Sequence, residues 1–310
     1  MNPTADAVHR FLFEPLDIRG ALVQLGPAWR EMQARRDYAP PVRDLLGELS
    51  AVTAVIGASL KVPGRLSFQL KGHGAVSLLV VDCRDHEGTL RLRGMARVDE
   101  AAGGAVPPGL TSSPTAVRHE SPPGLTSGVR GLLGDGQLVL TLQPDEGKPY
   151  QSVVPLVGDT LAAVFEHFLA QSEQQPAQLH LAADAGTACA LFLQKLPGAD
   201  ARDADGWDRV RQLAATVRGD ELSLPPEQLL RRLFPEEDVR LFRPRPVAWH
   251  CPRDEEKVRN MLQSLGREEL ERMLEDAGQI AVEDEICGQE YRFAPDVIDE
   301  LFPPAGRVLH

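Results

Sequence analysis

The 310-residue sequence has only four cysteines and no long apolar run. Four cysteines in a chain of this length do not form the disulfide framework of a small secreted domain. No stretch approaches the roughly 18 consecutive apolar residues that a membrane-spanning helix needs. Residues 1–20 also lack a basic segment followed by an apolar one, so no signal peptide is predicted. We therefore expect a cytoplasmic protein without a membrane partner.

Positive charge is scarce as well. The 33 Lys and Arg side chains stand against 45 Asp and Glu, which gives a net charge of −12. A nucleic-acid binder needs a basic face that displaces counterions from phosphates. The glycine pairs GHG (72–74) and GDG (134–136) are not followed by the Lys-Ser/Thr pair of a phosphate loop, so hairpin turns explain them better. The sequence therefore predicts neither a nucleic-acid partner nor a nucleotide cofactor.

What the chain does contain, over residues 1–197, is a mixture of helical and strand-like patterns. Residues 41–60 place apolar side chains at helical spacing and predict a buried helix. Residues 99–128 are rich in Pro, Gly, Ser and Thr and repeat the hexapeptide PPGLTS, which predicts a disordered loop insert. An α+β fold with a mixed sheet-and-helix core is expected. Three segments have the alternating or continuously apolar pattern of strands: 66–72, 76–82 and 90–98.

Residues 198–246 differ in character, because a polar connector is followed by two amphipathic helical pieces. Each piece is too short to be a stable helix alone, so we expect a helical linker that packs over the core at rest and comes away under stress. Its apolar stripes are the candidate client-binding surface. They consist of Trp207, Val210, Leu213, Leu229, Leu230, Leu233 and Phe234.

The cysteines fall into two groups. Cys83 and Cys189 lie in apolar runs and are expected to be small buried hydrophobes. Cys251 and Cys287 lie in polar, turn-rich segments of a small C-terminal domain, residues 247–310, and are the only thiols that suggest chemistry. An enzyme with a lone reactive thiol is disfavoured, since acidic neighbours raise a thiol pKa. These neighbours of Cys287 are Glu283, Asp284, Glu285 and Glu290.

Three separated stretches together resemble one family: RFLFEPLDIRG, VVPLVGDTLAAVFEHFLAQSEQQP, and WHCPRDEEKVRNMLQSLGREELERML with ICGQEYRF. The chain resembles the HslO-type holdase family of bacterial redox-regulated heat-shock chaperones over residues 8–302, interrupted by the insert. The resemblance implies a mixed core, a helical linker and a small C-terminal zinc-switch-like domain. It also implies an ATP-independent holdase that binds unfolding proteins under oxidative or heat stress and dimerises on activation.

The resemblance further implies a metal switch that this chain keeps only in part. In the family, four cysteines arranged as C-x-C and C-x-x-C bind zinc when reduced and form two disulfides when oxidised. Only Cys251 and Cys287 match, whereas Arg253 and Asp284 stand at the other two positions. Both family disulfides are then excluded, and the redox and zinc switch is expected to be impaired. A zinc site of two cysteines and Asp284, completed by water or His250, is one alternative, and a metal-free domain is the other.

If the chain keeps the family frame, Cys251 and Cys287 face each other, and a modest movement would join them in a disulfide. The pair is then a staple, a residual metal site or a relic. The alternative function is a binding or scaffold protein that kept the fold and lost redox-regulated chaperone activity. Aggregation of a heat-unfolded client, with and without peroxide, separates the two functions.

Overall fold

The computed structural model describes residues 6–99, 128–172 and 174–302. The chain divides into two compact units, Met1–His250 and Cys251–His310. The segment expected as a linker, 198–246, lies within the first unit. The expected loop insert falls, apart from its two end residues, outside the described residues.

The described part of the first unit contains eleven strands, seven α-helices and one 3₁₀ helix. None of the described helices is long and apolar enough to cross a membrane. The strands are β1 (Ala7–Phe13), β2 (Ile18–Leu25), β3 (Gly64–Gly72), β4 (Val76–His86), β5 (Thr89–Val98), β6 (Gly136–Pro144), β7 (Tyr150–Pro155), β8 (Ala177–Ala183), β9 (Ala188–Lys195), β10 (Val239–Leu241) and β11 (Arg245–Trp249). The helices are α1 (Pro27–Gln33), α2 (Pro40–Ser59), α3 (Val129–Leu133), α4 (Leu161–Ser172), α5 (Ala199–Arg202), α6 (Gly206–Ala214), η1 (Gly219–Ser223) and α7 (Pro226–Leu233).

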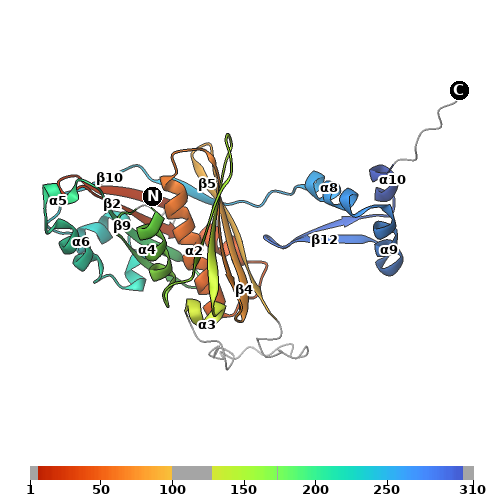
Figure 1. Ribbon diagram of the computed structural model, residues 1–310, viewed down its shortest axis with the longest axis horizontal. Coiled ribbons are helices and arrows are strands. Elements are labelled where there is room, and N and C mark those ends of the chain that lie inside the picture. Colours follow the sequence, from red (N-terminus) through yellow and green to blue (C-terminus); the bar gives the residue numbers. More distant parts are fainter. Residues whose placement is uncertain (1–5, 100–127, 173, 303–310) are drawn as a thin grey trace. The chain divides into compact units, whose positions relative to one another are not determined.

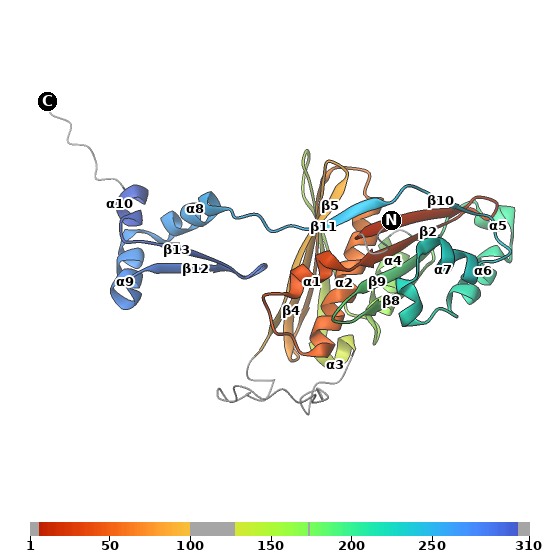
Figure 2. The ribbon, with the colours of Figure 1, turned by 180° about the vertical axis from the view of Figure 1, so that it is seen from behind.

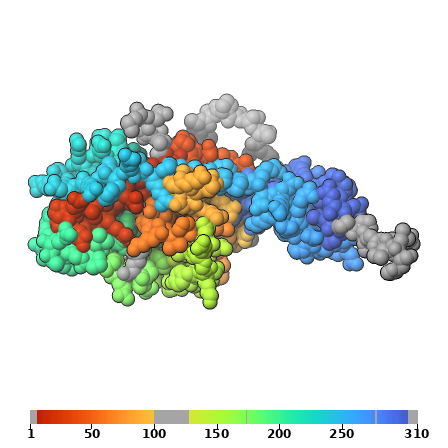
Figure 3. Space-filling model, turned by 90° about the horizontal axis from the view of Figure 1, so that it is seen from above, coloured from red at the N-terminus to blue at the C-terminus, as the bar shows by residue number. Residues whose placement is uncertain are grey.

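All eleven strands join one sheet in the order β7-β6-β3-β4-β5-β11-β1-β2-β9-β8, with β10 paired to β1 beside this path. The one parallel pair is β11 with β5, and every other pair among the described strands is antiparallel. Strand β1 pairs with β11 at Ala7 and Val8, and with β10 from Phe11 to Phe13. The chain after α7 is thereby built into the N-terminal sheet, and Figure 3 shows these cyan residues against the red N-terminal strands.

Helix α2 confirms the expectation of a buried helix over residues 41–60. Proline occupies its first turn, where the missing N–H costs nothing, and the helix lies across one face of the sheet (Figure 1). Its buried side chains, Leu46, Leu49 and Val52 among them, pack in the large core cluster with α4 and the strands. The three strands expected from residues 66–98 are present as β3, β4 and β5. The α+β fold class is confirmed.

A second cluster covers the opposite face of β1, β2 and β9. Successive side chains of a strand point to opposite faces of the sheet. In β2, Ala21 and Val23 belong to the α2 side, whereas Ile18 and Leu22 belong to the second cluster. This second side is covered by α6, η1 and α7 (Figure 2). The strands are therefore apolar on both faces where α2 lies on one side and residues 206–234 lie on the other.

The second unit is small. Its elements are α8 (Glu255–Leu265), α9 (Arg267–Ala277), β12 (Ile280–Asp284), β13 (Gln289–Phe293) and α10 (Val297–Leu301). The carboxylate of Asp254 caps α8 by accepting the N–H of Lys257, and Gly278 ends α9 in a left-handed conformation. Strands β12 and β13 form a hairpin. The core has seven buried side chains: Leu262, Leu270, Ile280, Tyr291, Phe293, Val297 and Ile298.

Candidate functional site

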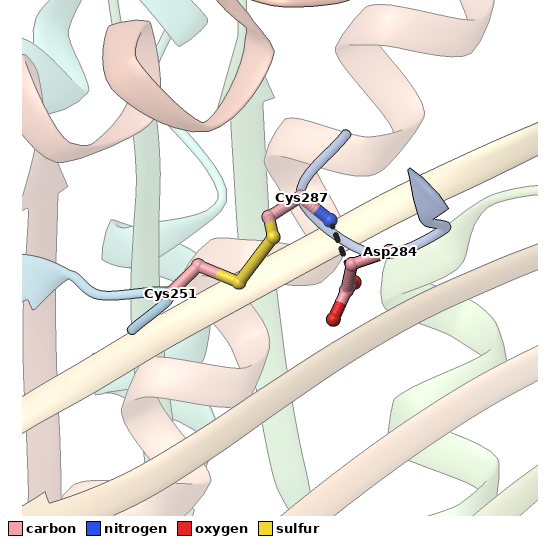
Figure 4. A group of neighbouring side chains, drawn as sticks. All are labelled: Cys251, Asp284 and Cys287. Carbon is pink, nitrogen blue, oxygen red and sulfur yellow. Dashed lines mark hydrogen bonds between the residues drawn. A yellow bond between two sulfur atoms is a disulfide. The ribbon is translucent and has the colours of Figure 1, made fainter. Parts of the chain in front are cut away.

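The two cysteines singled out by the sequence form a disulfide. Cys251 is the first residue of the second unit, and Cys287 lies in the turn that joins β12 to β13. Their Cα atoms are 6.3 Å apart, which is an ordinary separation for a disulfide, and both residues are buried (Figure 4). The other two cysteines, Cys83 and Cys189, are free and buried, as expected from their apolar surroundings.

Asp284 holds the turn that carries Cys287. One carboxylate oxygen of Asp284 accepts the backbone N–H of Ile286 at 2.8 Å and that of Cys287 at 3.2 Å (Figure 4). The backbone carbonyl of Asp284 accepts the N–H of Gly288 at 2.7 Å, and Gly288 adopts a φ of +64° that favours glycine. An aspartate that bonds the backbone two residues ahead is a common turn device. The carboxylate of Asp284 therefore fixes this turn from within the chain.

Arg253, at the other position where the resemblance implies a cysteine, packs against β13. Its guanidinium carbon lies 4.9 Å from the centre of the Tyr291 ring, a cation–π arrangement, and it donates to the carbonyl of Glu290. The amide of Gln289 donates to the carbonyl of Cys251 at 2.7 Å. The segment around Cys251 is thus fastened to β13 by several contacts besides the disulfide.

The sulfur atoms of Cys251 and Cys287 and a carboxylate oxygen of Asp284 lie within 4.8 Å of one another, which is the grouping that a metal site would need. Zinc binds ionised thiolates, and a structural zinc ion takes four ligands. Here the two sulfurs are bonded to each other, and one of the two carboxylate oxygens of Asp284 already accepts two N–H groups. This donor set does not fit zinc in the disulfide form. His250 belongs to the first unit, where its imidazole lies 3.2 Å from the Arg91 guanidinium.

The second candidate site is the covered face of the sheet, by which we mean the side of β1, β2 and β9 opposite α2. We call residues 206–234 the covering segment. The interface between them is almost entirely apolar. From the sheet it contains Phe11, Phe13, Ile18, Leu22, Cys189, Leu191 and Leu193. From the covering segment it contains Trp207, Val210, Ala214, Leu222, Leu229, Leu230, Leu233 and Phe234, with Leu213 partly buried.

Few specific polar bonds fasten the covering segment to the covered face. Gln24 of β2 donates from its side-chain amide to the carbonyls of Leu222 and Leu224. On the same side of the edge strand β8, the buried Oε1 of Gln178 and Nε2 of His180 have no hydrogen-bond partner among the described residues. Burial lowers the pKa of His180, because the charged imidazolium loses hydration there. Unpartnered buried polar atoms cost free energy, so this border of the interface is its weaker part.

The sequence profile of the family described as "Hsp33 protein" matches residues 6–294, nearly the whole chain. The chain belongs to the Hsp33 family. Among curated proteins it is similar to the 33 kDa chaperonin of Nitrosococcus oceani, with 39% identity over 96% of this chain and 94% of the relative. It is 36% identical to the 33 kDa chaperonin of Pseudomonas paraeruginosa, over 97% of this chain and 96% of the relative.

A solved structure shows the same fold. The 33 kDa chaperonin of Thermotoga maritima, a heat shock protein 33 homologue, superposes with a TM-score of 0.74 at 19% identity, over 96% of this chain and 97% of that one. Membership of the Hsp33 family confirms the resemblance inferred from the three sequence stretches, and it makes this chain a relative of chaperones.

In this Hsp33-family chain, the sequence pattern predicts only the covering half of the covered interface. All seven residues predicted as apolar stripes lie in that interface and face the sheet. Their partners on β1, β2 and β9 were not singled out. In β9 every side chain from Ala188 to Gln194 is buried, so no alternation in the sequence distinguishes the two faces. In β1, the aromatic residues Phe11 and Phe13 at a spacing of two were the available signal.

Proposed function

We propose that this protein is an ATP-independent holdase chaperone that binds unfolding proteins on apolar surface and keeps them from aggregating under heat or oxidative stress. The observation that carries the proposal is the covered face: an apolar sheet surface shielded by short helices of the same chain. When the covering segment comes away, both halves of the interface become available to a client. Contiguous exposed apolar surface of this kind is typical of protein-binding sites.

The covering segment is suited to detachment. Helix α6 has nine residues and α7 has eight, and isolated helices of this length are not stable in water. Their stability therefore comes from packing on the sheet, since a detached segment loses its helices together with its contacts. Heat weakens this arrangement because detachment releases the conformational entropy of the whole segment.

We further propose that the protein works in the cytoplasm, without nucleotide and without catalysing a reaction, and that it dimerises when active. The net charge of −12 disfavours nucleic acid as a partner. The clients are unfolded or partly folded proteins, which the apolar covered face would contact through side chains rather than through a specific motif. Zinc is not a resident cofactor of the disulfide form under this proposal, and the redox and zinc switch of the family is impaired.

One observation favours a second candidate, a binding or scaffold protein that kept the fold without regulated chaperone activity. Cys251 and Cys287 are already joined to each other, so the pairing of neighbouring cysteines that the family resemblance implies has no counterpart here. A scaffold would keep the covering segment in place at all temperatures. The two candidates therefore differ in whether heat exposes the covered face.

The test is the aggregation of a heat-unfolded client, followed by light scattering without nucleotide, with and without peroxide. Val210→Asp places a charge at a fully buried position of α6 and is expected to release the covering segment. Gln212→Asp adds the same charge at an exposed position of the same helix and serves as control. We expect Val210→Asp to suppress aggregation at a temperature where the wild type and Gln212→Asp do not. Failure of both the heated wild type and Val210→Asp to suppress aggregation would favour the scaffold.

A further inference from the structure

We propose that the Cys251–Cys287 disulfide locks the second unit, so that oxidation stabilises this unit and reduction loosens it, in a fold that does not depend on a metal. The proposal concerns the stability of residues 251–302 and stands on their contacts. Only its consequence for chaperone activity rests on the proposed function.

The disulfide ties the beginning of the second unit to its β-hairpin. It joins Cys251, where the unit begins, to the tip of the β12–β13 hairpin, and α8 and α9 lie in the chain between them. The sequence separation is 36 residues. Closing a loop of that length removes much of the freedom of the unfolded chain, and the core it supports has only seven buried side chains. The same cross-link contributes a larger share of the total stability in a unit this small than in a large domain.

Asp284 and Arg253 each have a structural role that needs no metal. The carboxylate of Asp284 closes the turn below Cys287 through two backbone N–H groups. The Arg253 guanidinium stacks on Tyr291, and the Tyr291 hydroxyl accepts the backbone N–H of Asp254 at the start of α8. Both ends of the disulfide are therefore positioned by contacts that do not involve the sulfur atoms. Reduction would leave two thiols held near each other, ready to be joined again.

The oxidation step is balanced with hydrogen peroxide as the oxidant. The thiolate of one cysteine attacks one oxygen of hydrogen peroxide, the O–O bond breaks, and the cysteine becomes a sulfenic acid; the second oxygen leaves as hydroxide, which takes up the proton lost by the thiol and becomes water. The thiol of the other cysteine then attacks this sulfur, the S–S bond forms, and the sulfenic oxygen leaves as a second water. Two cysteine thiols are oxidised by two electrons, and one peroxide is reduced to two waters.

A disulfide that stabilises the second unit gives this chain a response to stress that differs from the one implied by the family resemblance. Peroxide stabilises the folded second unit instead of unfolding it. Peroxide alone therefore does not release the covering segment by way of this unit. Heat remains the trigger, and a reducing environment lowers the threshold at which the second unit opens. If the holdase proposal is correct, reduced protein becomes active at a lower temperature than oxidised protein.

Hydrogen exchange of the full-length protein tests the lock directly. The wild type is compared after peroxide treatment and after reduction, both with a metal chelator, and mass spectrometry verifies the Cys251–Cys287 cross-linked peptide. We expect amides of Ile280–Asp284 and Gln289–Phe293 to exchange slower in the oxidised form by on the order of several hundredfold, the factor that chain entropy gives for this loop. Equal or faster exchange in the oxidised form overturns the proposal. This readout needs no client, so its failure leaves the holdase proposal standing.

Two substitutions of Asp284 test whether its carboxylate holds the turn or binds a metal. In reduced protein, Asp284→Asn keeps an oxygen that can accept the same two N–H groups, whereas Asp284→Ala removes it. We expect exchange of the hairpin to be unchanged in Asp284→Asn and at least tenfold faster in Asp284→Ala. An equal increase in hairpin exchange in the two variants would overturn the proposal that the fold does not depend on a metal. One zinc ion per reduced chain that slows exchange of the wild-type hairpin would overturn it as well. Should Asp284→Ala fail to fold, Asp284→Asn and the zinc measurement still decide it.

Discussion

The ring of Phe234, at the end of α7, packs edge-on against the ring of Phe13 in β1, with ring centroids 4.9 Å apart. Phe13 in turn contacts Phe11 edge-on at 5.7 Å. Edge-to-face pairs of this kind add to the burial energy of the rings. The three aromatic residues form a continuous connection from the sheet to the last helix of the covering segment, so Phe234 is its anchor.

Replacing Phe234 with alanine should therefore loosen the covering segment without unfolding the sheet. A Phe→Ala substitution at a buried site costs about 3–5 kcal/mol, here in the packing of α7 on the sheet. We expect faster hydrogen exchange in Pro226–Leu233 and holdase activity at a lower temperature. Tyr150→Ala removes an exposed aromatic ring from β7 and is the control. If exchange in α7 stayed at the wild-type rate, Phe234 would not be the anchor.

Gly20 provides a second probe of the covered face, from the sheet side. It pairs with Phe11 across β1 and β2, and the Phe11 ring occupies the space that a Cβ atom of residue 20 would need. Gly20→Ala must displace that ring and should destabilise the first unit by about 1–3 kcal/mol, measured by denaturant unfolding. Gly186→Ala, in a turn where no atom lies closer than 3.4 Å to the added Cβ, should change stability little. Equal effects of the two substitutions would contradict this packing.

Acidic pH should weaken the covering segment through His180. Its pKa is lowered below the ordinary 6.5 because burial disfavours the charged form. A histidine with a lowered pKa in the folded state contributes full stability above its ordinary pKa, and this contribution is lost as the pH falls from that value through the lowered pKa of the folded state. After correction for intrinsic exchange, α6 and η1 should exchange faster at pH 5.5 than at pH 7.5. His180→Gln should reduce this difference, and a difference of unchanged size would exclude His180 as its source.

Local patterns gave the fold class because they reflect short-range constraints. The helical spacing of residues 41–60 and the apolar runs that became β3, β4 and β5 needed no knowledge of distant residues. Strand β11 pairs in parallel with β5, and β1 pairs with both β10 and β11. These pairings join residues far apart in the sequence, so no local sequence pattern predicts them. The same reason explains why only the covering half of the apolar interface was predicted.

The sequence predicts which residues meet at the C-terminal site better than it predicts how they are arranged. The resemblance singled out Cys251, Cys287 and Asp284, which the structure brings together. It could not predict that Asp284 bonds the turn through its carboxylate, although the spacing to Ile286 is typical of such turns. His250, the other candidate ligand, lies beside Arg91, and burial, together with the positive charge of Arg91, lowers its pKa.

Heating should expose the covered face, and two native cysteines report on this exposure. Cys189 lies beneath the covering segment in the second cluster, whereas Cys83 lies in the main core beside α2. Both thiols are buried, and burial raises the pKa of both, so alkylation of either one requires that its surroundings open. With the Cys251–Cys287 disulfide intact, alkylation during heating is followed residue by residue by mass spectrometry, in parallel with client aggregation. We predict that Cys189 is alkylated at the temperature where aggregation is first suppressed, while Cys83 stays protected. Suppression of aggregation with Cys189 still protected, or simultaneous alkylation of both cysteines, would show that activity does not arise from exposure of the covered face.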